Sequence, residues 1–261
     1  MVYDQIVEYY FDYALEYGIR HFEIDLKKKH SQLHTFTPRR IASLRDWASK
    51  TGISLSLHPP FNLDLCTQSF IKRHYLKSYL VKCLHVAHGL KASHLTLHLG
   101  SFHRSALWSA PRQHALERLC KFLGKLLDTC ESLGISLALE NVVPLPPEAG
   151  FAFLGDNIND FQFIFERLES PYLKFCLDTG HANTNEGPLE YAAKLGEKII
   201  SVHFHDNHGK HDEHLDVGQG TVPWKELLST LENRNFHGPY ISECFKSQPH
   251  EAIKSLQNFF S

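Results

Sequence analysis

The segment SVHFHDNHGKHDEHLDVGQGTVPW, from Ser201 to Trp224, holds the densest set of side chains that could do chemistry. It begins with a strand-like alternation in which His203 separates Val202 from Phe204, and it continues into a loop rich in histidine and aspartate. Imidazole and carboxylate groups are the ligands that Zn²⁺ and Mn²⁺ take in proteins. A solvated, His-rich surface loop is the alternative interpretation. The number of donors at one strand end favours a metal site.

Potential metal ligands also follow the other predicted strands, at the point where each strand ends. They are His58 in LHPPF, His98 in LHLGS, Glu140 in LALENV, Asp178 and His181 in LDTGHAN, His203, Asp212 and His214 in the segment above, and Glu243 in ISECF. A single strand-end histidine is more often an ordinary core residue. Buried charges are costly unless they are paired or bound to metal, so a series of such strand ends predicts a shared metal centre.

An alternation of amphipathic helices and short apolar strands must position these residues. A glycine often follows the helix, as in LEYGIRHFEIDL and ESLGISLALENV, and glycine is the usual left-handed cap of a helix. Alternating helices and strands predict a parallel sheet with right-handed crossovers. We therefore predict one α/β domain over residues 1–261, a (β/α) TIM barrel with its chemistry at the carboxyl ends of the strands.

The predicted elements give seven strands and eight helices. The strands are His21–Leu26, Ser54–His58, His94–His98, Ser136–Asn141, Leu173–Asp178, Ile200–His205 and Tyr240–Glu243. The helices are Asp4–Tyr17, Pro38–Lys50, Gln68–His88, Ala110–Ser132, Ile158–Leu168, Pro188–Leu195, Pro223–Leu231 and Glu251–Phe259. The chain begins on a helix where an eight-stranded barrel would have its first strand. We expect that the barrel is open or that its first strand precedes Met1.

Composition and charge restrict the possible partners. The net charge of −2 gives no overall attraction to nucleic acid or to an acidic membrane. No apolar run approaches the ~18 residues of a membrane span, and the N-terminus has no signal-peptide pattern. The six cysteines form no CxxC motif and no disulfide-like framework. They are expected to be reduced and mostly buried, in a cytoplasmic protein.

The motifs LENV, LDTGHAN, VHFHDN…DEHLDVGQGTVPW and GPYISE resemble those of the xylose-isomerase-like TIM-barrel superfamily. That superfamily contains sugar-phosphate isomerases and epimerases, and also the class II AP endonucleases of the endonuclease IV type. The resemblance extends from about Phe22 to Glu243 and is most specific in the His-rich segment. It implies a metal-dependent enzyme.

The ketose epimerases of this superfamily imply one central ion, zinc or manganese. By motif, its ligands would be Glu140, Asp178, His203 and Glu243, and His181 would contact the substrate. Glu140 and Glu243 would be the catalytic pair. One removes the proton beside the substrate carbonyl and the other returns it, while the metal stabilises the enediolate. An isomerase or epimerase of a small sugar or sugar phosphate is the favoured function.

The endonuclease IV type implies three zinc ions, which suit the hydrolysis of a phosphodiester. The same four residues would hold the central ion. His58 and His98, with Glu140 bridging, would hold a second ion, and His181, Asp212 and His214 would hold a third. Nucleic acid is expected as a partner only under this alternative. The DNA-wedging loops of those endonucleases are not recognisable in this sequence, which weighs against it. A non-catalytic metal-binding barrel is a third hypothesis, and the oligomeric state is not predicted.

Two further residues are candidates for substrate contact. Lys28 lies in the basic loop LKKKHSQLHTFTPRR, where it could bind a phosphate group or remain in a solvated, charged loop. Trp108 could line the pocket or pack a helix against the barrel.

Residues next to His203 are expected to support it. Asp206 and Asn207 could orient its ring, since a metal-bound imidazole normally donates its other N–H. His203 and His205 share one face of a regular strand, which leaves open whether both bind metal.

Overall fold

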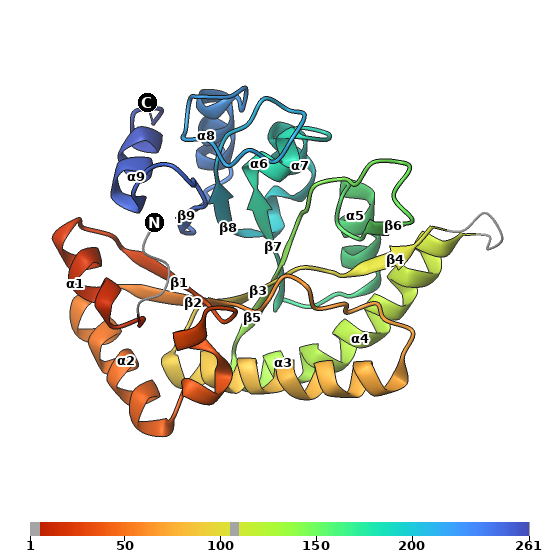
Figure 1. Cartoon of the computed structure of the whole chain (residues 1–261), viewed down its shortest axis with the longest axis horizontal. Coiled ribbons are helices and arrows are strands. Elements are labelled where there is room, and N and C mark those ends of the chain that lie inside the picture. The colour runs from red at the N-terminus through yellow and green to blue at the C-terminus, as the bar shows by residue number, and fades with distance from the viewer. Residues whose placement is uncertain (1–5, 105–109, 261) are drawn as a thin grey trace.

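The computed structural model describes residues 6–104 and 110–260, and its centre is one sheet of seven parallel strands (Figure 1). Their order is β1 (His21–Asp25), β2 (Ser54–His58), β3 (His94–Leu97), β5 (Ser136–Glu140), β7 (Leu173–Asp178), β8 (Ile199–Phe204) and β9 (Tyr240–Ser242). The first and last strands, β1 and β9, lie side by side. No backbone ladder joins them in the part of the chain that is described. The sheet is therefore a nearly closed TIM barrel.

Helices cover the outside of this sheet. They are α1 (Tyr9–Glu16), α2 (Pro38–Thr51), α3 (Phe70–Leu90), α4 (Pro111–Leu133), α5 (Ile158–Arg167), α6 (Thr179–Asn183), α7 (Pro188–Leu195), α8 (Trp224–Asn233) and α9 (Pro249–Gln257). Short 3₁₀ turns are η1 (Lys29–Ser31), η2 (Leu33–Thr35) and η3 (Gly196–Lys198). In the view of Figure 1, α2, α3 and α4 lie below the sheet and α7 and α8 lie above it.

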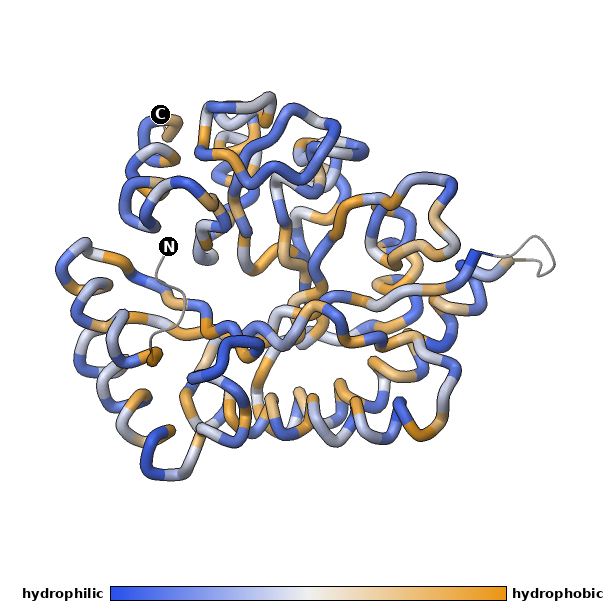
Figure 2. The backbone as a smooth tube through the Cα atoms, in the orientation of Figure 1, coloured by the Kyte–Doolittle hydropathy of each residue, from blue (hydrophilic) through white to orange (hydrophobic). Residues whose placement is uncertain are grey.

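The packing follows from the spacing of apolar residues. Figure 2 shows apolar and polar residues alternating along α3. Its buried leucines, Leu76, Leu80 and Leu84, recur at every fourth position, which places them on one side of the helix. Leu55 and Leu57 of β2 are almost fully buried and belong to the same apolar cluster. This cluster between strands and helices is the core that holds the barrel together.

The seven predicted strands are confirmed, and no predicted end differs from the observed one by more than one residue. Besides the 3₁₀ turns, three elements were not predicted. The segments β4 (Ser101–His103) and β6 (Phe151–Phe153) pair antiparallel beside the barrel, and α6 begins directly after β7. Each of these elements has five residues or fewer. Such short segments are too brief to show a hydrophobic period in the sequence.

Two expectations from composition can be compared with the fold. All six cysteines are buried and none is in a disulfide, as predicted. Among the described residues, no helix is both long and apolar enough to cross a membrane.

Candidate metal centre

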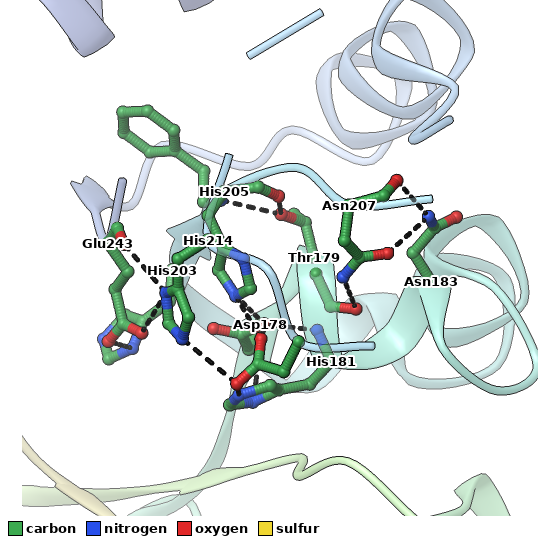
Figure 3. A network of polar contacts seen from close by, with 12 residues as sticks. Asp178, Thr179, His181, Asn183, His203, His205, Asn207, His214 and Glu243 are labelled. Carbon is green, nitrogen blue, oxygen red and sulfur yellow. Dashed lines mark hydrogen bonds and ion pairs between the residues drawn. The ribbon is translucent and has the colours of Figure 1, made fainter. Parts of the chain in front are cut away.

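All nine predicted ligands are described, and they meet at the carboxyl ends of the strands. They form three groups, and within each group the potential ligand atoms lie within 4.8 Å of one another. The groups are Glu140, Asp178, His203 and Glu243; His58, His98 and Glu140; and His181, Asp212 and His214, which His205 joins. Figure 3 shows His203, Asp178 and Glu243 from close by. The structure brings these distant residues together, and their binding of metal stays a prediction.

The central group is built around one ring nitrogen. His203 Nδ1 lies 3.0 Å from Glu140 Oε1 and 2.9 Å from Glu243 Oε1. Asp178 is fully buried, and its Oδ2 has no hydrogen-bond partner within the described ranges. Three carboxylates and one imidazole match the donor chemistry of a divalent cation. A bound cation would also satisfy Asp178 Oδ2, which is buried without a hydrogen-bond partner among the described residues. The residues of this group therefore fit the predicted metal.

The charges of this group are strongly coupled. Burial by itself would raise the pKa of Glu140, but His98 and His203 outweigh it and hold the pKa well below its usual range. Burial would likewise lower the pKa of His203, and the acidic groups around it, Cys176 and Glu140 first, raise that pKa well above its usual value. The carboxylates therefore need a positive charge among them, which a protonated imidazole or a metal ion can supply.

The second group uses the other oxygen of Glu140. His58 Nε2 and His98 Nε2 each lie 3.0 Å from Glu140 Oε2. The Nδ1 atom of His58 lies 2.7 Å from the carbonyl oxygen of Pro59, which fixes the orientation of its ring. Glu140 thus presents one oxygen to the central group and one to this group, which is the geometry of a bridging carboxylate.

The third group combines His181 of α6 with Asp212 and His214 of the loop after β8. His181 Nε2 and His214 Nε2 lie 3.4 and 3.1 Å from Asp212 Oδ2. Burial would lower the pKa of His181, yet Asp178 and then Asp212 raise it to about 10. The Nδ1 atom of His214 lies 2.8 Å from the carbonyl oxygen of Glu243, so the ring is held between this loop and the chain after β9.

His205 is the unexpected member of the third group. Its Nε2 lies 3.1 Å from Asp178 Oδ1 and 3.7 Å from Asp212 Oδ1, and the side chain is fully buried. The ring fits because residue 180 is glycine. A Cβ atom on Gly180 would collide with the imidazole of His205. His203 and His205 therefore both point into the site, each toward a different group (Figure 3).

Comparison with known proteins agrees with this architecture. Residues 11–261 match the model of the xylose isomerase-like TIM barrel family. This chain belongs to that family. An uncharacterized protein of Methanocaldococcus jannaschii is 30% identical over 231 residues, which cover 86% of this chain and 75% of that protein.

Relatives with assigned activities fall into two classes. Fructoselysine 3-epimerase of Escherichia coli O157:H7 is 30% identical over 122 residues, which cover 46% of this chain and 42% of the epimerase. A probable endonuclease 4 of Mycoplasma mobile is 29% identical over 166 residues, or 58% of this chain and 55% of that protein. Both classes are enzymes, and they catalyse different reactions.

Among solved structures, a D-tagatose 3-epimerase-like protein superposes with a TM-score of 0.82 at 25% identity, covering 98% of this chain and 93% of that one. The IOLI protein, solved with a zinc atom bound, superposes with a TM-score of 0.78 at 15% identity, covering 99% of this chain and 92% of that one. The second likeness is one of fold.

In this xylose isomerase-like barrel the sequence prediction missed Glu23. The side chain lies inside the barrel, and its Oε1 is 2.9 Å from His203 Nε2. Glu23, His58 and His203 also form a fourth group of potential ligands. The signal was present in the sequence, because Glu23 is a charged residue in the middle of a predicted barrel strand.

The predicted role of Asp206 is wrong. Asp206 does not contact His203 but accepts hydrogen bonds from the loop that follows it. Its Oδ1 accepts from the backbone N–H groups of Asn207 and Val222, and its Oδ2 accepts from the Gly218 N–H and the Trp224 indole, all at 2.9–3.1 Å. Asp206 thus fixes the path of the loop that carries Asp212 and His214.

The two remaining candidates for substrate contact are less informative. Lys28 Nζ lies 3.9 Å from Asp25 Oδ2, and its side chain is 46% exposed. Trp108 lies outside the described residues. A cavity of about 860 Å³ is lined by residues of the loop after β1 and of α3, Lys27 and Tyr79 among them, and by none of the nine predicted ligands. Lys27 Nζ lies 4.6 Å from the centre of the Phe61 ring, which also contacts His98.

Proposed function

We propose that this protein is a divalent-metal-dependent isomerase or epimerase of a small sugar or sugar phosphate. The observation that supports this best is the pair of carboxylates around His203. Glu140 at the end of β5 and Glu243 after β9 approach the same nitrogen at 3.0 and 2.9 Å. Two carboxylates that enter one site from different strands could move a proton to and from a substrate held between them.

The two glutamates differ in access, which suggests different roles. The Glu243 side chain is 28% exposed, whereas that of Glu140 is 1% exposed. We infer that Glu243 removes the proton from the carbon beside the substrate carbonyl. Glu140 would pass a proton from the protonated ring of His58, whose Nε2 lies 3.0 Å from it, to the same carbon from the opposite face, which inverts its configuration. Glu243 would then release its proton to solvent, and His58 would take one up. His58 and His98 hold Glu140 in place.

Zinc or manganese is the proposed cofactor, held by Glu140, Asp178, His203 and Glu243. Such an ion would polarise the carbonyl and stabilise the enediolate that forms when the carbon loses its proton. Epimerases among the related proteins support a sugar as the substrate.

Solvent deuterium exchange tests this proposal. The metal-loaded protein is incubated in D₂O with a panel of ketoses and ketose phosphates, and the recovered sugars are analysed by NMR for deuterium beside the carbonyl. Exchange is expected with wild type and lost in Glu243→Gln and Glu140→Gln. Glu226→Gln, on the exposed face of α8, is the matched control and should exchange as wild type does. No exchange with any sugar would count against the proposal.

A second candidate is a phosphoester hydrolase with three zinc ions. It is favoured by the two flanking groups, which meet the central group through Glu140 and Asp178. Metal content per chain separates the two functions. About three zinc ions, falling to about one in the double variant His58→Ala/His214→Ala, would favour the hydrolase. One ion that this double variant retains would favour the isomerase.

A further inference from the structure

The inside of this barrel is polar where most barrels are apolar. Inward-facing layers of a TIM barrel are usually filled by Val, Ile and Leu. Here Glu23 of β1 contacts Ser56 of the neighbouring β2, Thr96 of β3 and His203 of β8. Contacts from one strand to others that are not its neighbours require that these side chains point into the barrel.

Glu23 connects this interior to the metal centre. Its Oε2 accepts hydrogen bonds from Ser56 Oγ at 2.8 Å and from Thr96 Oγ1 at 2.9 Å. Its Oε1 forms an ion pair with His203 Nε2 at 2.9 Å, and the side chain is only 7% exposed. Ser56 and Thr96 therefore fix Oε2, and Oε1 faces the His203 ring at ion-pair distance, although Nε2 has no aligned hydrogen-bond partner within the described ranges. Neighbouring histidines, His203 first, lower the pKa of Glu23 against the opposing effect of burial.

The same network continues toward the opposite end of the barrel. His21 Nε2 lies 2.9 Å from Ser56 Oγ, and His21 Nδ1 lies 2.7 Å from Ser54 Oγ. Because Ser56 donates its proton to Glu23, its oxygen is left to accept from His21. Burial lowers the pKa of His21 to about 4, so its ring is neutral near pH 7 and can donate through Nε2. Ser54, His21, Ser56, Glu23 and His203 thus form one chain of polar contacts.

We propose that Glu23 is the positioning residue of the central metal site, because it accepts from the hydrogen that stays on His203 Nε2 when an ion occupies Nδ1, on the side of Glu140, Asp178 and Glu243. A carboxylate can only accept, and a neutral imidazole that binds an ion through Nδ1 has its one hydrogen on Nε2. Metal-bound histidines generally need such a partner on the other nitrogen. The inference rests on the central metal site of the proposed function and does not depend on which reaction the site performs.

Glu23 could instead serve only the stability of the barrel interior, and metal binding distinguishes the two roles. Zinc dissociation constants are measured by competition with a chromophoric chelator, and cobalt-loaded protein gives a visible spectrum that reports the ligand geometry. Glu23→Ala is expected to weaken zinc binding by about 10–100-fold and to change the cobalt spectrum. Glu23→Gln keeps an oxygen that can accept from Nε2–H and should restore most of the affinity and the spectrum.

Ser201→Ala is the matched control. Ser201 is a fully buried residue of β8, two positions before His203, and its Oγ has no hydrogen-bond partner within the described ranges. Its removal should leave zinc affinity and the cobalt spectrum unchanged. Circular dichroism verifies the fold of each variant. If Glu23→Ala does not fold, Ser56→Ala, which removes one donor to Glu23, should weaken zinc binding by a smaller factor.

Two results would overturn the inference. One is a folded Glu23→Ala variant with the zinc affinity and cobalt spectrum of wild type, or, where that variant does not fold, a Ser56→Ala variant with both unchanged. The other is a wild-type protein that binds neither ion. A protein that binds metal, shows the Glu23 effect and exchanges no deuterium into any sugar would sustain this inference while contradicting the proposed isomerase.

Discussion

Replacing Asp206 by alanine should release the loop that carries Asp212 and His214. The carboxylate is fully buried and accepts four hydrogen bonds, from three backbone N–H groups and the indole of Trp224. A buried donor left without an acceptor costs about 1–3 kcal/mol. With four such donors, the free energy of unfolding should fall by at least about 4 kcal/mol. A typical domain has a total free energy of unfolding of only about 5–15 kcal/mol.

The assay is urea unfolding of chelator-treated protein, followed by circular dichroism, with metal content measured separately after reloading. Asp206→Ala should unfold at a much lower urea concentration than wild type. If the loop opens before the barrel does, the reloaded variant should lose the ion of the His181 group and keep the central one.

Asp216→Ala is the control for this prediction. Asp216 lies in the same loop and accepts one hydrogen bond, from Ser247 Oγ at 2.7 Å. Its removal should cost about 1 kcal/mol. A loss below about 2 kcal/mol for Asp206→Ala, or equal losses for the two variants, would refute the view that Asp206 holds this loop.

Three further predictions concern other parts of the site and its support. Gly180→Ala should displace the ring of His205, since the added methyl collides with it, and isothermal titration should show weaker zinc binding to the third group. The pKa of His58 is raised from 6.5 to about 9, because Glu140 outweighs the opposing effect of burial. The His58–Glu140 pair therefore contributes its full stabilisation to the metal-free protein below pH 6.5. That stabilisation is lost as His58 loses its proton, so the melting temperature should fall as pH rises toward 9. Arg112→Ala leaves the buried carboxylate of Asp160 without its ion pair of 2.7 Å, and urea unfolding should show a loss of about 3–5 kcal/mol.

The strand ends could be predicted because two regularities coincide there. A period-two pattern identifies each strand, and the residue that ends it is a potential ligand, as at His58 and Asp178. Parallel strands bring their carboxyl ends to one face, so residues far apart in sequence were placed together without knowledge of any contact.

The barrel interior could not be predicted in the same way. The sequence shows that Glu23 sits in a buried strand, but it does not show which strand lies opposite, and that partner gives the carboxylate its role. His205 was left open for a similar reason, because the space for its ring depends on Gly180 in another element. The pairing of β4 with β6 joins segments about 50 residues apart, and neither has a pattern of its own.

The open side of the barrel gives metal binding a mechanical consequence. β1 and β9 lie side by side without a backbone ladder in the described chain. Glu23 on β1 and Glu243 after β9 both contact His203 of β8. An ion held by His203 and Glu243 would join β8 to the chain after β9, and the contact of His203 with Glu23 would extend that link to β1, the other edge of the incomplete ring. By mass action, such an ion adds about 2.7 kcal/mol to the free energy of unfolding when the free metal concentration is a hundredfold above the dissociation constant. The concentration of free metal in the cell would therefore influence the stability of this incompletely closed barrel.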